Sequence, residues 1–137
     1  MMSQEELLAG VAACVAKVID RDPLGIAPSD RIISDLGADS LDLLDLMFQL
    51  EQRFKIRIKP RDIERRAREE LGDAPLEVNG IYTDAAVAQL RRVMPEVPEA
   101  ELHEGLPAAR LPYSFRVQTF VNLVARLMEA QHGYSNK

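Results

Sequence analysis

The chain has 137 residues, a length that suits a single domain with one hydrophobic core. Apolar residues make up 47% of it but aromatic residues only 5%, so aliphatic side chains must fill the core, which suits helices packed on helices. The net charge of −5 argues against nucleic acid as a partner, and the single cysteine, Cys14, excludes an internal disulfide.

The N-terminal residues MMSQEELL have neither the basic start nor the apolar run of a signal peptide. No stretch reaches 18 consecutive apolar residues, as a membrane-spanning helix would require. We therefore expect a cytoplasmic protein without stable membrane insertion.

The first predicted helix follows a capping box formed by Ser3 and Glu6. Apolar residues at intervals of three and four continue to Ile19, and Pro23 predicts that the helix stops near Asp20. Cys14 lies on the apolar stripe, where a buried and unreactive thiol is expected. A long loop then runs to Asp35.

The second predicted helix runs from about Ser40 to Arg53. Its apolar residues cover more of its circumference than one core-facing stripe needs. We therefore expect this helix to be covered on two sides or to line a cavity.

The second half of the chain predicts shorter elements. Residues 55–59, KIRIK, alternate like a strand but lack an obvious partner strand, and a short helix ends at Gly72. Asn79-Gly80 predicts a turn, and Thr83 can cap a helix that ends before Pro95.

The last predicted helix is capped by Ser114 and ends near Gly133. A linker at 99–112 precedes it, and a frayed tail at 133–137 follows it. The predicted fold class is all-α: three long helices, a short third helix and no convincing sheet. We expect one domain, residues 1–137, with an insertion at about 73–113 packed on the bundle.

Charge is distributed unevenly along the chain. Between residues 20 and 51 there are eight acidic residues against two basic ones, whereas residues 53–70 contain eight basic residues against four acidic ones. Most such runs are solvated surface. Their density around Ser40 favours a recognition surface.

Catalytic motifs are mostly absent. His103 and His132 have no cysteine or carboxylate at metal-ligand spacing, and no glycine-rich phosphate loop occurs. Ser40 lacks a G-x-S-x-G context and a histidine placed to act as its base. We therefore expect a protein that is not an enzyme and that holds no metal.

Ser40 stands where a helix exposes unpaired backbone N–H groups and the positive end of its dipole. On chemistry alone, Ser40 or Asp39 is best explained as a helix cap. The alternative is that the Ser40 hydroxyl is modified, since the same helix end would favour an attached phosphate.

Residues 35–54, DLGADSLDLLDLMFQLEQRF, resemble the signature of acyl carrier proteins around the serine that bears their prosthetic group. The motif D-[LF]-G-x-D-S-L-[DE] is matched at Asp35, Gly37, Asp39, Ser40 and Asp42. The resemblance is specific over residues 1–63, plausible over 114–130 and absent between them.

The resemblance implies that a phosphopantetheinyl transferase attaches 4′-phosphopantetheine to Ser40, with Asp39 and Leu41 beside it in the cofactor site. An acyl group would then be carried as a thioester and presented to synthases, reductases or acyltransferases by a monomeric carrier. The acidic residues that would meet a basic partner are Asp35, Asp39, Asp42, Asp45 and Glu51. The residues expected to line the acyl cleft are Leu44, Met47, Phe48 and Leu50.

Two features depart from the family pattern: the basic stretch after Glu51 and the roughly 40 residues between Gly72 and Tyr113. We hypothesise that this insertion extends or covers the acyl cleft for a long or unusual acyl chain in fatty acid or lipid synthesis. It could instead pack an exposed side or dock a dedicated enzyme. A polyketide or aminoacyl carrier, or an unmodified helical interaction protein, remains the alternative.

Overall fold

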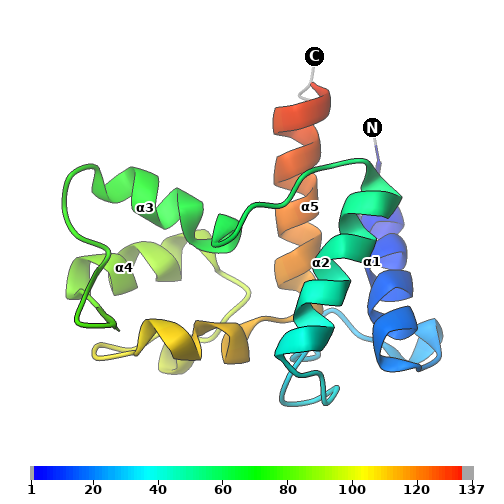
Figure 1. The fold of residues 1–137 in the computed structure, drawn as a ribbon, viewed down its shortest axis with the longest axis horizontal. Helices are drawn as coiled ribbons and strands as arrows, with labels where there is room; N and C mark the ends of the chain where they lie inside the picture. Colours follow the sequence, from blue (N-terminus) through cyan, green and yellow to red (C-terminus); the bar gives the residue numbers. More distant parts are fainter. Residues whose placement is uncertain (1, 134–137) are drawn as a thin grey trace.

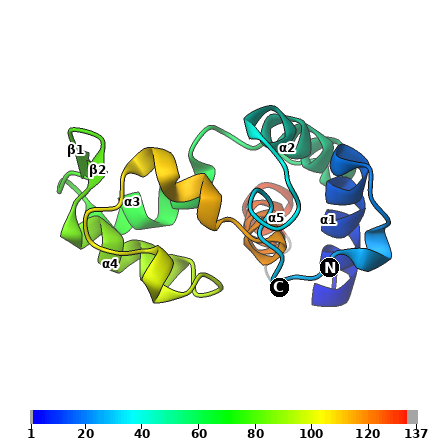
Figure 2. The same cartoon turned by 90° about the horizontal axis from the view of Figure 1, so that it is seen from below.

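The computed structural model describes residues 2–133 and contains two groups of elements side by side (Figures 1 and 2). The first group is a bundle of the three long helices, α1 (Gln4–Ile19), α2 (Ser40–Phe54) and α5 (Val117–His132). The second group contains α3 (Arg65–Leu71), α4 (Asp84–Val93) and a small hairpin of β1 (Glu77–Val78) and β2 (Ile81–Tyr82). The all-α prediction is confirmed.

Four 3-10 helices complete the described part of the chain. They are η1 (Pro23–Gly25), η2 (Asp62–Glu64), η3 (Glu99–Glu101) and η4 (Ala108–Ser114). η2 leads into α3, and η4 leads back from the second group to α5 (Figure 2).

Aliphatic side chains fill the bundle, as the composition predicts. Val11 of α1, Leu50 of α2 and Val124 of α5 are completely buried. Helices α1 and α2 also approach closely, because a Cβ atom added at Gly10 would lie only 2.6 Å from the Phe54 ring. Cys14 is buried on α1, and burial raises the pKa of its thiol.

Helices α2 and α5 run in the same direction along the bundle, and α1 runs in the opposite direction (Figure 1). α1 begins and α5 ends at the upper end in Figure 1, whereas α2 begins at the lower end. Ser40, the first residue of α2, therefore lies at the opposite end of the bundle from the first turn of α1 and the last turn of α5.

The hairpin corrects the expectation that the chain has no sheet. Glu77 pairs with Tyr82 and Val78 with Ile81, and the predicted Asn79-Gly80 turn joins them with positive φ at both residues. Two consecutive positive φ angles are typical of the tight turn that matches the twist of two antiparallel strands. The sequence did not predict these strands because two residues are too few to show an alternating pattern.

The start of α5 also differs from the prediction. Ser114 does not cap the helix: it ends η4, and its hydroxyl donates to the Leu111 carbonyl at 2.6 Å. The following residues are extended and pair with the loop before α2, since the Ile32 N–H donates to the Phe115 carbonyl and the Val117 N–H to the Asp30 carbonyl, each at 3.0 Å. The helix therefore starts at Val117.

The remaining predicted elements agree with the structure. α1 follows the Ser3–Glu6 capping box, and residues 56–59 form an extended connector that buries Ile56, after Lys55 has ended α2 in a left-handed conformation. α4 is capped by Thr83 and α3 is followed by Gly72. Of the predicted frayed tail, residues 134–137 lie outside the described residues.

The short third helix packs mainly on α4, in the second group. The buried apolar side chains nevertheless form one continuous cluster that reaches from Val11 in the bundle to Leu90 in α4. For that reason we propose that both groups belong to a single domain.

Candidate functional site

The turn that precedes α2 is fixed by buried side chains and backbone hydrogen bonds. Leu36 and Ala38 are buried, and the Ala38 N–H donates to the Ile32 carbonyl at 3.1 Å. Gly37 between them has a φ of +79°, a left-handed conformation that glycine adopts without strain. These contacts therefore fix the position of the turn and, with it, the position of Ser40 at the start of α2.

Asp39, and not Ser40, caps α2. Its carboxylate accepts from the Asp42 N–H at 2.9 Å, while the Asp42 carboxylate accepts from the Asp39 N–H at 3.0 Å. Ser40 is the first helical residue and is exposed, and within residues 2–133 its hydroxyl has no hydrogen-bond partner. The serine is therefore free for chemistry that a capping residue could not perform without loss of the cap.

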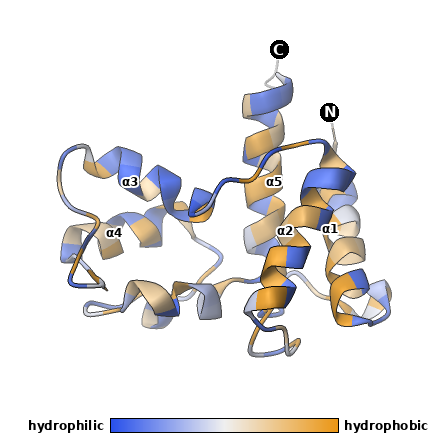
Figure 3. Ribbon diagram, in the orientation of Figure 1, coloured by the Kyte–Doolittle hydropathy of each residue, from blue (hydrophilic) through white to orange (hydrophobic). Residues whose placement is uncertain are grey.

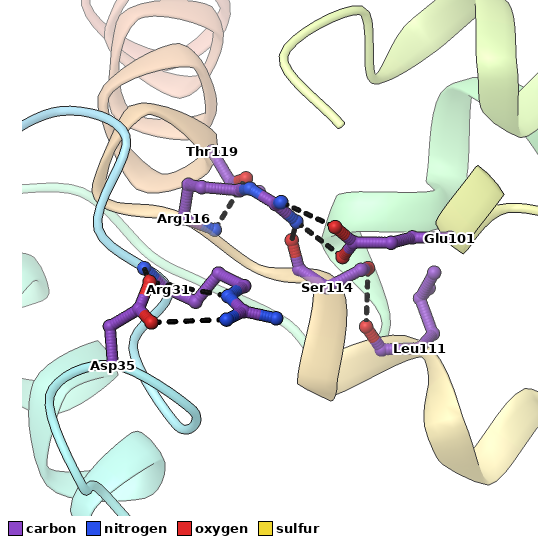
Figure 4. Close-up of polar contacts among 7 residues, drawn as sticks. All are labelled: Arg31, Asp35, Glu101, Leu111, Ser114, Arg116 and Thr119. Carbon is purple, nitrogen blue, oxygen red and sulfur yellow. Dashed lines mark hydrogen bonds and ion pairs between the residues drawn. The ribbon is translucent and has the colours of Figure 1, made fainter. Parts of the chain in front are cut away.

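Polar contacts connect this turn to the second group (Figure 4). The Asp35 carboxylate accepts from the Arg31 backbone N–H at 2.8 Å and from its guanidinium at 3.1 Å, and these bonds lower the pKa of Asp35. Residue 31 pairs in turn with Arg116, whose buried guanidinium forms a bidentate ion pair with Glu101 at 2.6 Å. The ion pair holds η3, which follows α4 of the second group, against the start of α5.

The five acidic residues predicted to bind partners have different surroundings. Asp35 pairs with Arg31, and Asp39 and Asp42 form the capping box. Asp45 is exposed beside Gln49. Glu51 is half-buried, and its carboxylate accepts from the Ile58 N–H at 2.8 Å, so it anchors the connector after α2.

The structure separates the four residues predicted to line an acyl cleft. Met47 lines a cavity, but Leu50 is completely buried in the bundle core. Leu44 and Phe48 face outwards, with exposed fractions of 63% and 54%, and do not line it. The prediction treated all apolar residues of α2 as one inward surface, whereas at about 100° per residue they form two separate faces.

Comparisons with known proteins agree with this geometry. The family model for the phosphopantetheine attachment site matches residues 9–72. The acyl carrier protein of Thermotoga maritima is 34% identical over 65 residues, which are 47% of this chain and 80% of the relative. The chain belongs to the acyl carrier protein family.

Two further relatives extend the comparison. The acyl carrier protein of Thermosynechococcus vestitus is 38% identical over 64 residues, 47% of this carrier and 79% of the relative. The meromycolate extension acyl carrier protein of Mycobacterium tuberculosis is 31% identical over 62 residues, 45% of this carrier and 54% of the relative. No solved structure gives a significant match.

The cofactor of this carrier is 4′-phosphopantetheine. The site fits a group linked through phosphate, because an exposed, unpaired hydroxyl stands at a helix N-terminus, where the dipole favours negative charge. Within residues 2–133, no cluster of three or more histidine, cysteine or acidic side chains could hold a metal. No helix of that part of the chain is long and apolar enough to cross a membrane.

Sequence reasoning missed an exposed apolar stripe next to Ser40. Leu41 is 73% exposed and continues the outward face of Leu44 and Phe48. Figure 3 shows that α2 is more hydrophobic towards its N-terminal end and that a mostly hydrophilic connector follows it. The spacing i, i+3, i+7 from Leu41 would have revealed the stripe had the two faces of α2 been separated.

The cavity next to Met47 was also missed as a specific site. It has a volume of about 360 Å³ and lies where α2, α5, the connector and η4 meet. Its walls include Ile58, Leu111, Phe115 and Leu123. These residues are far apart in the sequence, so no local pattern predicts their meeting.

Proposed function

We propose that Ser40 bears the 4′-phosphopantetheine arm of this acyl carrier. The observation that carries the proposal is that Asp39 caps α2, whereas the exposed Ser40 hydroxyl has no hydrogen-bond partner within residues 2–133. Asp39 and Leu41 flank the attachment point, the first as the cap and the second as an exposed apolar contact.

This chain contributes one reacting atom to the attachment reaction, the Ser40 Oγ. A phosphopantetheinyl transferase would use coenzyme A: the Ser40 Oγ forms a bond to the phosphorus next to the pantetheine, the pyrophosphate bond breaks, and adenosine 3′,5′-bisphosphate leaves as the serine proton is removed. The arm supplies a terminal thiol on which an acyl group is held as a thioester. Ser40 fixes where that thiol is tethered.

Partner enzymes meet the start of α2 in this proposal. The exposed stripe of Leu41, Leu44 and Phe48 offers an apolar contact, and Asp45 beside it offers a negative charge. A partner with an apolar recess and a basic rim would fit this surface, and the charges would mainly steer the encounter. Synthases, reductases and acyltransferases of fatty acid or lipid synthesis are the proposed classes, served by a monomeric carrier.

The basic connector restricts the choice of partners. Lys55, Arg57 and Lys59 are exposed, while Ile56 and Ile58 between them point inward. A partner that grips an acidic helix end would be repelled here. The protein is therefore proposed to serve a dedicated set of enzymes and not to replace a general carrier.

Coexpression with a promiscuous phosphopantetheinyl transferase tests the attachment. Intact mass should show the gain of one phosphopantetheine group in the natural chain and in Ser34→Ala, a matched change at an exposed serine of the same turn. Ser40→Ala should gain nothing. Equal gain in Ser40→Ala would refute the assignment, and no gain in any variant with several transferases would favour an unmodified interaction protein.

A further inference from the structure

The bundle itself offers little room for a cargo next to Ser40. The hollow between Val15, Ala38 and Leu46 has essentially no free volume. A second hollow of about 250 Å³ lies between the first turn of α1 and the C-terminal half of α5, at the end of the bundle opposite Ser40. A chain tethered at Ser40 therefore needs another place to be sheltered from water.

The cavity next to Met47 is placed to receive it. Met47 lies two turns along α2 from Ser40, and η4 lies level with the N-terminal turns of α2 in Figure 1. At about 360 Å³ the cavity falls within the usual range of roughly 300–1,000 Å³ for small-molecule sites. Its wall on the bundle side is Met47 and Leu123, and η4 contributes Ala108 and Leu111.

The buried polar groups of the wall are satisfied by contacts with neighbouring side chains. The buried Glu64 carboxylate accepts from the Tyr82 hydroxyl and from the Arg61 guanidinium, which also pairs with Glu77 at 2.6 Å. Burial and the bond to Glu64 raise the pKa of Tyr82 and keep it a donor. Within residues 2–133, no buried side-chain nitrogen or oxygen lacks a hydrogen-bond partner.

The buried part of this wall offers no unpaired side-chain donor or acceptor to a polar cargo, whereas Lys59, which also lines the cavity, is exposed to solvent. Burying a hydroxyl or keto group without a hydrogen bond is costly, whereas each buried methylene is favourable. The buried apolar wall therefore favours hydrocarbon chains over the oxygen-rich chains of a polyketide or aminoacyl carrier.

We propose that the carried acyl group is a hydrocarbon chain that leaves the three-helix bundle and lies in the cavity between α2, α5 and η4. This inference rests on the proposed function, because it takes the chain to start from an arm on Ser40. The second group of elements then acts as half of the cargo site.

Protection of the thioester tests the proposal. Carriers loaded with saturated chains of increasing length are treated with hydroxylamine after intact mass has confirmed loading. The cleavage rate should fall by up to about fourfold for each methylene that enters the cavity, and level off when the cavity is full. A chain of equal length with a hydroxyl group midway should be cleaved faster, and equal protection of the two would refute the hydrocarbon class.

Filling the cavity provides a matched comparison. Ala108→Trp should end the protection at a shorter chain length, because the indole occupies space in the cavity. Ala88→Trp, at an exposed position of α4, should behave like the natural chain. Unchanged protection in a folded Ala108→Trp protein would overturn the proposal.

Methyl NMR of the natural sequence gives a second readout that needs no cavity mutation. Loading a long chain should shift the signals of Met47 and Leu123. The signals of Val15 and Leu46, inside the bundle, should stay in place. The reverse pattern would place the chain between α1 and α2 and refute the inference.

A chemical tether separates this inference from the attachment proposal. In Ser40→Cys, a long-chain alkyl maleimide forms a thioether at residue 40 without any transferase, while the buried Cys14 thiol with its raised pKa stays unmodified. If enzymatic attachment fails but Met47 and Leu123 still shift, the cavity site stands and the attachment proposal falls. If attachment succeeds and these signals do not move, the cavity site falls alone.

Discussion

The bundle and the second group differ in the free volume that their packing leaves. In the bundle, Val11, Leu50 and Val124 are completely buried, and the hollow next to the Ser40 turn has essentially no free volume. The second group packs its own residues just as tightly, with Leu90 and Leu102 fully buried, but leaves a cavity where η4 meets the bundle. The family model starts at residue 9, within α1, covers α2 and α3, and stops at residue 72. The matched part of the chain thus holds the turn before α2 and one side of the cavity, and the part beyond residue 72 supplies the rest of the cavity wall.

The bundle core should be the most sensitive part of the molecule. Phe120 is completely buried and meets Phe115 edge to face at 5.8 Å between ring centres. Phe120→Ala should lower the free energy of unfolding by about 4 kcal/mol, because it removes a large side chain and leaves a cavity. Chemical denaturation followed by circular dichroism measures the change.

The matched control for that substitution is Phe48→Ala, on the exposed stripe. It should change stability by less than about 1 kcal/mol, as surface substitutions usually do. If both groups form one domain, amide exchange at Leu90 in α4 should accelerate in Phe120→Ala together with exchange in the bundle. An unaffected Leu90 would show that the second group unfolds independently.

The connection between the groups should come next in sensitivity. Arg116 is 8% exposed and holds Glu101, so Arg116→Met should cost about 3 kcal/mol by leaving a partly buried carboxylate unpaired. Thermal and denaturant unfolding measure the loss.

The pH dependence of that loss is its internal control. The Arg116 guanidinium lowers the pKa of Glu101, so the carboxylate contributes stability above the ordinary glutamate pKa of about 4.3, and this contribution disappears as pH falls through the lowered value. The stabilities of Arg116→Met and the natural chain should therefore converge in acid. A constant difference between pH 7 and pH 3 would contradict the assigned role of the pair.

The turn before α2 should show the smallest effect. Gly37→Ala should cost about 1 kcal/mol, because alanine is strained at a φ of +79° although space is open around it. Gly25→Ala, which also has open space but no positive φ, should be near neutral. Denaturation midpoints compare the two, and equal effects would argue against strain at the turn.

The sequence predicted the elements whose signals are local. Capping residues and apolar spacing located α1, α2 and α4, and the Asn79-Gly80 pair located the hairpin turn, because each depends on neighbours within a few residues. The predicted start of α5 was wrong, because hydrogen bonds to a distant loop keep residues 115 and 116 extended.

The site was predicted less completely than the fold. The turn before α2 could be placed from its motif, but periodicity alone did not say which apolar residues of α2 face the core, the solvent or a cavity. Leu44 and Phe48 are exposed because no other element within residues 2–133 covers that face. The wall formed by Leu111, Phe115 and Leu123 depends on how η4 returns to the bundle, which no local pattern encodes.

The directions of the long helices have a practical consequence. Since α1 starts and α5 ends far from Ser40, a fusion partner or surface anchor joined beyond either helix would leave the proposed attachment turn pointing away from it. Immobilised in this way, the carrier would present the proposed loading point, Ser40, to enzymes in the surrounding solution, and the same orientation would be obtained from both ends.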